Sequence, residues 1–389
     1  MTNGIELVGD LGYLLIVCSG VGAIAYILKQ PMVLGFLVAG ILIGPFGPLS
    51  LIKNTDMLNN FSDIAIVLLL FGVGLSFPLS QLRAVGKLGI GISLIEVVVM
   101  LCVGFALGYA LGWSFYDTMF LAAAISVSST AIIIKVLENM NKIDATSSVV
   151  LTGILVIEDL IAVVMISIIH ANVVAQSFQL VNAMWTVGKV GLFIGGTITL
   201  GTIAVPKIFA LIARLERYEI TITFALGIAF GLAFLSYNLG FSAATGAFLA
   251  GVVIAGSKFS DQISNLISPT REIFTAIFFV TIGALMNMSS IFLYWVPVLV
   301  ITTGIVLGKV GGVYAGTRLF GFNRQYALGM GLSMAQLGEF SFIVLKTGQD
   351  LNVISNMLFP IIGMAVALTT MIGPMLIKAG TRVVAIYEH

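Results

Sequence analysis

The stretch LTGILVIEDLIAVVM, residues 151–165, places two adjacent carboxylates, Glu158 and Asp159, near the middle of a long apolar run. A charged side chain costs several kcal/mol at the centre of a membrane-spanning helix. Two neighbouring carboxylates would not persist at that depth without a use, so the pair is by default a candidate functional site. The rest of the chain is expected to hold, neutralise or move this pair.

The composition indicates a polytopic membrane protein. Of the 389 residues, 59% are hydrophobic and 9% are charged, whereas a soluble domain carries about 25% charged residues. The net charge of +1 indicates no acidic or nucleic-acid partner, so membrane lipid is the expected surrounding. The N-terminal residues lack a basic region and a cleavage site, so no signal peptide is expected.

The apolar runs predict an all-α fold with about thirteen membrane-spanning helices. Their expected ranges are about 8–28, 32–49, 61–79, 86–112, 117–138, 146–170, 183–213, 219–236, 241–257, 272–288, 291–318, 324–346 and 353–385. Lys and Arg gather in the connections that follow the odd-numbered spans and at the C-terminal end. The positive-inside rule then predicts a cytoplasmic C-terminus and an outside N-terminus in the cell (inner) membrane.

An internal repeat is visible in two pairs of motifs. GFLVAGILIG (35–44) resembles GAFLAGVVIAG (246–256), and LLFGVGLS (69–76) resembles FFVTIGAL (278–285). Both pairs, and the two interrupted helices described next, are offset by about 210 residues, and the copies start seven spans apart, as in the inverted repeats of secondary transporters. The expected organisation is repeat 1 at about 8–170, a linker helix at about 183–213 and repeat 2 at about 219–385. Chance similarity among Gly-rich helices is the alternative.

Two expected helices are interrupted by polar residues at matching places in the two repeats. Ser126-Val-Ser-Ser-Thr130 interrupts the fifth span, and Ser333-Met-Ala-Gln-Leu-Gly-Glu339 interrupts the twelfth. Such a pair is the best sequence indication of an ion site at the membrane midplane, because unwound backbone frees carbonyls and amides. Carbonyl oxygens and the hydroxyls of Ser128, Ser129 and Thr130 can replace the hydration shell of a small cation. The alternative for these hydroxyls is ordinary hydrogen bonding between helices.

Lys309 is the expected charge partner of the acidic pair. Glu158 and Asp159 lie about 100° apart around a helix, so they face different surroundings. One carboxylate needs a permanent positive partner, and the other can alternate between a proton and a metal cation. Lys309 lies deep in the eleventh span between glycines, which favours pairing with a carboxylate over snorkelling to the interface.

Other ionisable and sulfur-containing residues within apolar runs have less specific interpretations. Glu339 is either a structural partner for freed amides or a second proton site. Glu96 and Lys189 are expected in helix-packing ion pairs or at the lipid interface. Cys18 and Cys102 are expected to be core packing residues.

The sequence offers no pattern for an enzyme or a resident cofactor. It has no P-loop, no nucleophile constellation and no Gly-rich dinucleotide turn after a strand. Two histidines do not support a transition-metal site.

These motifs resemble those of the monovalent cation:proton antiporters of family 2, which include Kef-type potassium efflux systems and NapA-type sodium/proton antiporters. The resemblance runs from about residue 31 to 346. It rests on Gly40-Ile-Leu-Ile-Gly44-Pro45, Leu69-Leu70-Phe71-x-x-Gly74-Leu75, Ser128-Ser129-Thr130-Ala131, Glu158-Asp159, Phe278-Phe279-x-x-x-Gly283, Lys309 and Gly338-Glu339-Phe340.

The resemblance implies an NhaA/NapA-like fold with two crossed, unwound helices, and a homodimer. It implies transport helices at about 61–79, 117–170, 272–288 and 324–385, with the remainder forming dimerisation helices. Kef-type relatives also carry a cytoplasmic nucleotide-binding regulatory domain after the last helix. This sequence ends at His389, so two alternatives are open: the natural protein is short, or such a domain has been removed.

By the same resemblance, Asp159 carries the ion and the proton. The first acidic position is Asp in NapA-like members and Gln in Kef-like members, and Glu158 departs from both. Because Glu158 keeps the charge, a Glu158–Lys309 pair is favoured.

The sequence therefore predicts a secondary antiporter that exchanges Na⁺ or K⁺ for H⁺ by elevator-type alternating access, with proton and cation competing for Asp159. If Lys309 stays charged, exchange is one for one and electroneutral; if it releases its proton on cation binding, two protons move per cation. The alternatives are a gated K⁺ efflux pathway resembling a channel and a Na⁺-coupled symporter of organic solutes.

Overall fold

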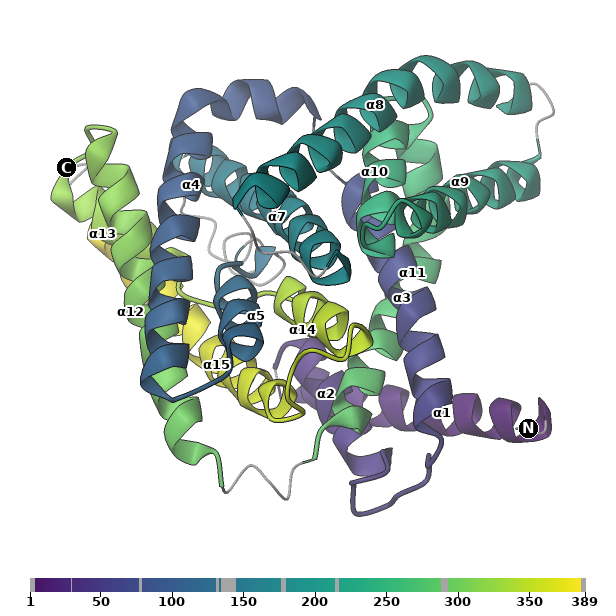
Figure 1. Ribbon diagram of the computed structural model, residues 1–389, viewed down its shortest axis with the longest axis horizontal. Coiled ribbons are helices and arrows are strands. Elements are labelled where there is room, and N and C mark those ends of the chain that lie inside the picture. The colour runs from purple at the N-terminus through teal and green to yellow at the C-terminus, as the bar shows by residue number, and fades with distance from the viewer. Residues whose placement is uncertain are drawn as a thin grey trace. The chain divides into compact units, whose positions relative to one another are not determined.

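The computed structural model (Figure 1) describes residues 4–28, 30–76, 79–130, 133, 145–175, 180–213, 217–287 and 293–385. Within these ranges the chain forms fourteen helices and an isolated antiparallel bridge between Ser128 and Leu337. Nine of the described helices are long and apolar enough to cross a membrane, by length and composition. The protein is therefore an all-helical, multi-pass membrane protein, as predicted, whereas the count of thirteen spans stays a prediction.

Contacts divide the chain into two compact units. Unit 1 comprises Met1–Leu79 and Val163–Asn287, and unit 2 comprises Ser80–Ala162 and Met288–His389. Helix α7 (Ala145–Val174) begins in unit 2 and ends in unit 1.

Unit 1 is built on two helices, α3 and α11, which pack against each other. Helix α2 packs against α1 and α11, and α10 packs against α3, α8 and α9. The helices of this unit are α1 (Gly4–Ile27), α2 (Met32–Ile43), α3 (Thr55–Leu75), α8 (Leu180–Ala213), α9 (Tyr218–Asn238), α10 (Ala243–Ala255) and α11 (Ser260–Leu285).

Helices α2 and α11 approach each other closely through one glycine from each side. A Cβ atom added at Gly40 would lie 2.0 Å from the carbonyl oxygen of Val280. In return, a Cβ added at Gly283 would lie 2.2 Å from the carbonyl oxygen of Leu37. Small residues of this kind let the backbones of membrane helices touch.

Helices α3 and α10 use the same device. A Cβ added at Gly74 would lie 2.2 Å from the carbonyl oxygen of Phe248, and one at Gly251 would lie 2.2 Å from that of Phe71. The four helices in these two contacts carry the four motifs that indicated the internal repeat. The motif at 35–44 in α2 packs on the motif at 278–285 in α11. The motif at 246–256 in α10 packs on the motif at 69–76 in α3.

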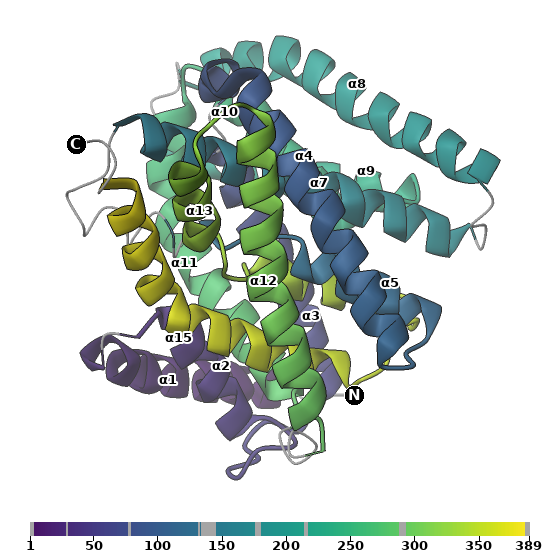
Figure 2. The same cartoon turned by 90° about the vertical axis from the view of Figure 1, so that its left-hand side faces the viewer.

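Unit 2 contains both interrupted helices. In Figure 2, α13 lies beside α12, and it also packs against α15; α14 packs against α5. The helices of this unit, besides the start of α7, are α4 (Leu79–Ala110), α5 (Phe115–Ile125), α12 (Trp295–Leu319), α13 (Arg324–Ser333), α14 (Phe340–Asp350) and α15 (Leu358–Ala385).

Both predicted interruptions are confirmed. Helix α5 ends at Ile125, and helical structure resumes at Thr130. Helix α13 ends at Ser333, and α14 begins at Phe340. Most of the second half of the fifth predicted span, after Thr130, lies outside the described residues.

Side-chain caps define where the two interrupted helices start. The Ser114 hydroxyl accepts a hydrogen bond from the Asp117 amide (3.1 Å). The Asn323 side-chain oxygen accepts one from the Tyr326 amide (2.7 Å). Ser and Asn are favoured at this position because they satisfy amides that a first helical turn leaves unpaired.

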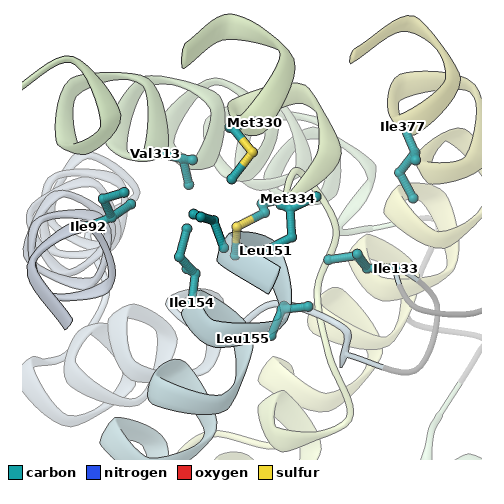
Figure 3. Close-up of a cluster of buried hydrophobic side chains, with 10 residues drawn as sticks. Ile92, Ile133, Leu151, Ile154, Leu155, Val313, Met330, Met334 and Ile377 are labelled. Carbon is teal, nitrogen blue, oxygen red and sulfur yellow. The ribbon is translucent and has the colours of Figure 1, made fainter. Parts of the chain in front are cut away.

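Buried apolar side chains from five helices form a cluster in unit 2 (Figure 3). They come from α4, α7, α12, α13 and α15, together with one residue after the first break and the residue that caps the end of α13. The cluster consists of Ile92, Ile133, Val150, Leu151, Ile154, Leu155, Val313, Met330, Met334 and Ile377. It joins the N-terminal part of α7, which carries the acidic pair, to the helix that leads into the second break.

The contact units group the helices differently from the expected transport and dimerisation sets. Helices α3 and α11, expected among the transport helices, belong to unit 1. Helices α4 and α12, expected outside that set, belong to unit 2 with both breaks. The reason is packing: α3 is bound to α10 through paired glycines, and a buried ion pair links α4 to α12. The division into transport and dimerisation helices stays a prediction.

Candidate functional site

The two interrupted segments meet backbone to backbone. Ser128 and Leu337 form an antiparallel bridge, in which the Gly338 amide donates to the Val127 carbonyl (3.2 Å). The Ser129 amide donates to the carbonyl of Gln336 (3.3 Å). Pairing between the breaks satisfies some of the groups that unwinding frees, which is necessary where no water is present.

The close approach at this crossing depends on Gly338. A Cβ atom added there would lie 2.4 Å from the Ser128 carbonyl oxygen, a distance that real Cβ atoms do not adopt. The glycine of the Gly338-Glu339-Phe340 motif is therefore required by backbone contact with the first break.

Glu158 binds the backbone of the first break. Its side chain is buried, with 1% of its surface exposed. Its Oε2 atom accepts a hydrogen bond from the Ser128 amide at 2.9 Å. The carboxylate thus satisfies an amide that the interruption releases.

Asp159 faces a different neighbour, as its position on the helix predicted. Its Oδ2 atom accepts a hydrogen bond from the Thr130 hydroxyl at 3.1 Å. The side chain is buried, and Oδ1 has no hydrogen-bond partner among the described residues. A buried carboxylate oxygen without a partner is costly, so Oδ1 is a candidate atom for binding a proton or a cation.

The prediction that Lys309 pairs with Glu158 is wrong. Lys309 is fully buried and forms its salt bridge with Glu96, with Nζ 2.7 Å from Oε1. Its ammonium also donates to the Ser128 hydroxyl at 2.9 Å. Glu158 instead accepts a hydrogen bond from the Ser128 amide.

Packing between α4 and α12 explains this correction. Gly312 of α12 lies against the backbone of Glu96, since an added Cβ would lie 3.1 Å from the Glu96 Cα. Gly308 allows a similar approach to Met100. The expectation that Glu96 enters a helix-packing ion pair is confirmed, and Lys309 is the partner that sequence reasoning did not assign.

Glu339 lies at the second break, directly before α14. It is half-buried and close enough to Asp159 for an electrostatic interaction. The structure therefore brings the acidic residue of the second break to the acidic pair of α7. The two alternatives for Glu339, a structural partner for freed amides and a second proton site, both stay predictions.

Two other predicted residues have different surroundings. Lys189 is exposed on α8, with its ammonium 5.8 Å from the centre of the Trp185 ring, and is not in a described ion pair. Cys18 is buried, as expected, but the expectation of core packing for Cys102 is wrong because it lies on an exposed part of α4.

Sequence reasoning missed the role of Asp117. Its two carboxylate oxygens accept hydrogen bonds from the Ser355 amide and the Ser355 hydroxyl, both at 2.7 Å. The start of α5 is thereby tied to the segment before α15. The available signal was an Asp at the start of an apolar run, but its partner is far away in the sequence.

Buried carboxylates beside two interrupted helices are the arrangement with which secondary transporters bind ions near the membrane midplane. The chain belongs to the family of transmembrane sodium/hydrogen exchangers, whose family model matches residues 13–379. The membership in the monovalent cation:proton antiporters that the motifs indicated is thereby confirmed.

Individual relatives agree with the family. The chain is 31% identical over 363 residues to YbaL of Escherichia coli (strain K12), covering 91% of this chain and 65% of YbaL. It is 28% identical over 361 residues to the Na(+)/H(+)-K(+) antiporter GerN of Bacillus cereus, covering 92% of each. The chain spans just under two thirds of the length of several curated relatives that it matches (65, 66 and 64%).

A solved structure has the same fold. The sodium proton antiporter MjNhaP1 from Methanocaldococcus jannaschii, at pH 8, matches with a TM-score of 0.76 over 97% of this chain and 99% of that chain. The sequence identity is 20%, so this likeness concerns the fold.

Proposed function

We propose that this chain exchanges a monovalent cation, Na⁺ or K⁺, for protons, and that both ions compete for the carboxylate of Asp159. The observation that carries the proposal is the state of that carboxylate. Oδ2 is held by the Thr130 hydroxyl, while Oδ1 is buried beside the crossing of the two breaks and has no hydrogen-bond partner in the part of the chain that the structure describes. A site of this kind favours either a proton or a desolvated cation over an empty negative charge.

Thr130 is the side chain that we assign as the principal partner of Asp159 in cation binding. The Ser128 hydroxyl is already engaged, because it accepts from Lys309 and donates to the Met334 carbonyl (3.4 Å). Ser128 and Glu158 therefore hold the shape of the site. Ser129 and the carbonyl oxygens of the break complete the proposed set of ligands.

The proposed cycle follows from charge. Ionised Asp159 binds a cation, and the carboxylate with its bound cation carries no net charge. This neutral complex passes the apolar barrier at a lower energy than a bare carboxylate would. On the other side a proton replaces the cation, and the protonated carboxyl returns. Competition at one carboxylate couples the two fluxes without a second transport site.

We propose one-for-one, electroneutral exchange. Lys309 contacts Glu96, which lies outside the adjacent Glu158–Asp159 pair. Binding of a cation at Asp159 therefore leaves the partner of Lys309 in place, and nothing in the cycle requires Lys309 to release its proton.

The relatives support the class of ions. GerN is a Na(+)/H(+)-K(+) antiporter and MjNhaP1 is a sodium proton antiporter, by their names. We carry over to this chain only the exchange of a small monovalent cation for protons.

We further propose elevator-type alternating access in a homodimer, built on two inverted repeats. The support for the repeats is the matched contacts of α2 with α11 and of α10 with α3, each made through paired glycines. Unit 2, which holds the breaks, the acidic pair and Lys309, is the candidate transport body, so this proposal omits α3 and α11 from the transport set expected from the sequence. The proposed orientation has the N-terminus outside and the C-terminus in the cytoplasm, because of the distribution of Lys and Arg.

The test is proton movement in proteoliposomes that hold a preset pH gradient, with Na⁺, K⁺ or Li⁺ added in turn. Asp159→Asn serves as the inactive control, since it keeps the shape and removes the charge. We expect one or more cations to dissipate the gradient in the wild type and none to do so in Asp159→Asn.

Two other outcomes would overturn the proposal. Cation flux without proton movement, unaffected by Asp159→Asn, would support the pathway resembling a channel. Dissipation of the gradient that persists in Asp159→Asn would show that another group carries the proton.

A further inference from the structure

The buried ion pair of Glu96 and Lys309 is not used by the proposed cycle. The two residues lie on α4 and α12, and both are 0% exposed. Breaking such a pair on one side leaves an uncompensated buried charge. Apolar residues could join the two helices equally well. We therefore expect the ion pair to have a second role.

The ammonium of Lys309 connects this pair to the first break. Nζ lies 2.7 Å from Glu96 Oε1 and donates to Ser128 Oγ at 2.9 Å. Ser128 in turn donates its amide to Glu158 Oε2 at 2.9 Å. A continuous chain of contacts thus runs from α4 through α12 and the break to α7.

Glu158 is also within electrostatic range of Glu96. Two buried carboxylates therefore lie near one ammonium, and the ammonium contacts Glu96. If Glu96 lost its charge, Glu158, which binds the amide of the same Ser128 that Lys309 contacts, would be available to pair with Lys309. Glu158 would then be drawn away from the Ser128 amide, which would be left buried without a partner.

We propose that Glu96 is a positioning residue for ion binding: by holding Lys309, it reserves Glu158 for the Ser128 amide and so fixes the first break. Thr130, two residues further on, depends on that backbone for its hydrogen bond to Asp159. This inference rests on the proposed function, because its main readout is cation affinity.

The test compares Glu96→Gln, Glu96→Asp, Lys309→Gln and the double variant Glu96→Gln/Lys309→Gln. Glu219→Gln on α9 is the matched control, because Glu219 is exposed. Each protein is assayed for the apparent KM and the maximal rate of cation-driven proton movement, and for its melting temperature.

We expect Glu96→Gln to raise the apparent KM by about tenfold, as for the loss of one hydrogen bond to a charged group, with a smaller effect on the maximal rate. Glu96→Asp should retain more affinity because it keeps the charge. The double variant should recover affinity relative to Glu96→Gln, because no ammonium remains to attract Glu158. A purely structural role would lower the melting temperature without this pattern in KM.

Two results would overturn the inference. One is an unchanged apparent KM in Glu96→Gln. The other is a double variant whose loss of cation-binding free energy equals the sum of the losses in the two single variants. If the wild type itself shows no exchange, the proposed function fails instead. The melting temperatures of the four variants then test the coupling of Glu96 and Lys309 separately, since additive shifts would refute it.

Discussion

Ser128 and Leu337, which lie on different interrupted helices, form an antiparallel bridge at the crossing of the two breaks. The bridge joins segments of unit 2 that the sequence separates by the second part of unit 1, Val163–Asn287. Because backbone hydrogen bonds join the two breaks, we expect a change in one break to affect the other.

Gly338→Ala is expected to destabilise the protein by about 1–3 kcal/mol, as overpacking does. The added methyl would lie 2.4 Å from the Ser128 carbonyl oxygen, so the bridge would have to open. The measurement is the melting temperature in detergent together with exchange activity. Gly311→Ala is the control, since no atom of the described residues lies within 4 Å of an added Cβ there. Equal melting temperatures for the two variants would contradict the close contact.

Thr130→Val is expected to weaken cation binding by about tenfold, the effect of removing one hydrogen bond to a charged group. The hydroxyl that donates to Asp159 Oδ2 is lost, while the shape of the side chain is kept. Thr130→Ser retains the hydroxyl and should stay close to the wild type. The apparent KM for the cation in proteoliposomes decides the matter, and a Thr130→Val protein with wild-type affinity would remove Thr130 from the proposed ligand set.

Asp117→Ala is expected to lower stability by about 1–3 kcal/mol, because buried donors lose their acceptor. Asp117 is 3% exposed and binds both the amide and the hydroxyl of Ser355. Hydrogen exchange should rise in the segment that precedes α15. Asp56→Asn, an exposed position in the first turn of α3, is the control. An unchanged rate of amide hydrogen exchange at Ser355 in Asp117→Ala would argue against the hydrogen bonds between Asp117 and Ser355.

Gly251→Ala is expected to destabilise unit 1, because the added methyl would lie 2.2 Å from the carbonyl oxygen of Phe71. Gly40→Ala should behave in the same way, since its Cβ would meet Val280 in the matching contact. Gly227→Ala on α9 has open space and should be tolerated. Melting temperatures in detergent test all three. A large difference between Gly251→Ala and Gly40→Ala would weaken the case for equivalent repeats.

Local sequence patterns predicted several features well. Polar residues within apolar runs located both interruptions, because a helix in a membrane is recognised by an unbroken apolar pattern. The adjacent carboxylates marked the acidic pair, because charge at that depth is rare. Each of these signals is contained in a few helical turns of sequence and needs no knowledge of packing.

The sequence alone determined that this is an all-helical membrane protein with two interrupted helices and an acidic pair, Glu158 and Asp159, since hydropathy and charge are properties of neighbouring residues. Only the tertiary structure decided which groups meet. The contact of Lys309 with Glu96 rather than Glu158 depends on how closely α4 and α12 approach at Gly312. Residues far apart in the sequence are brought together by such packing, and the identity of a lysine's partner is set by a few ångströms that no local pattern encodes.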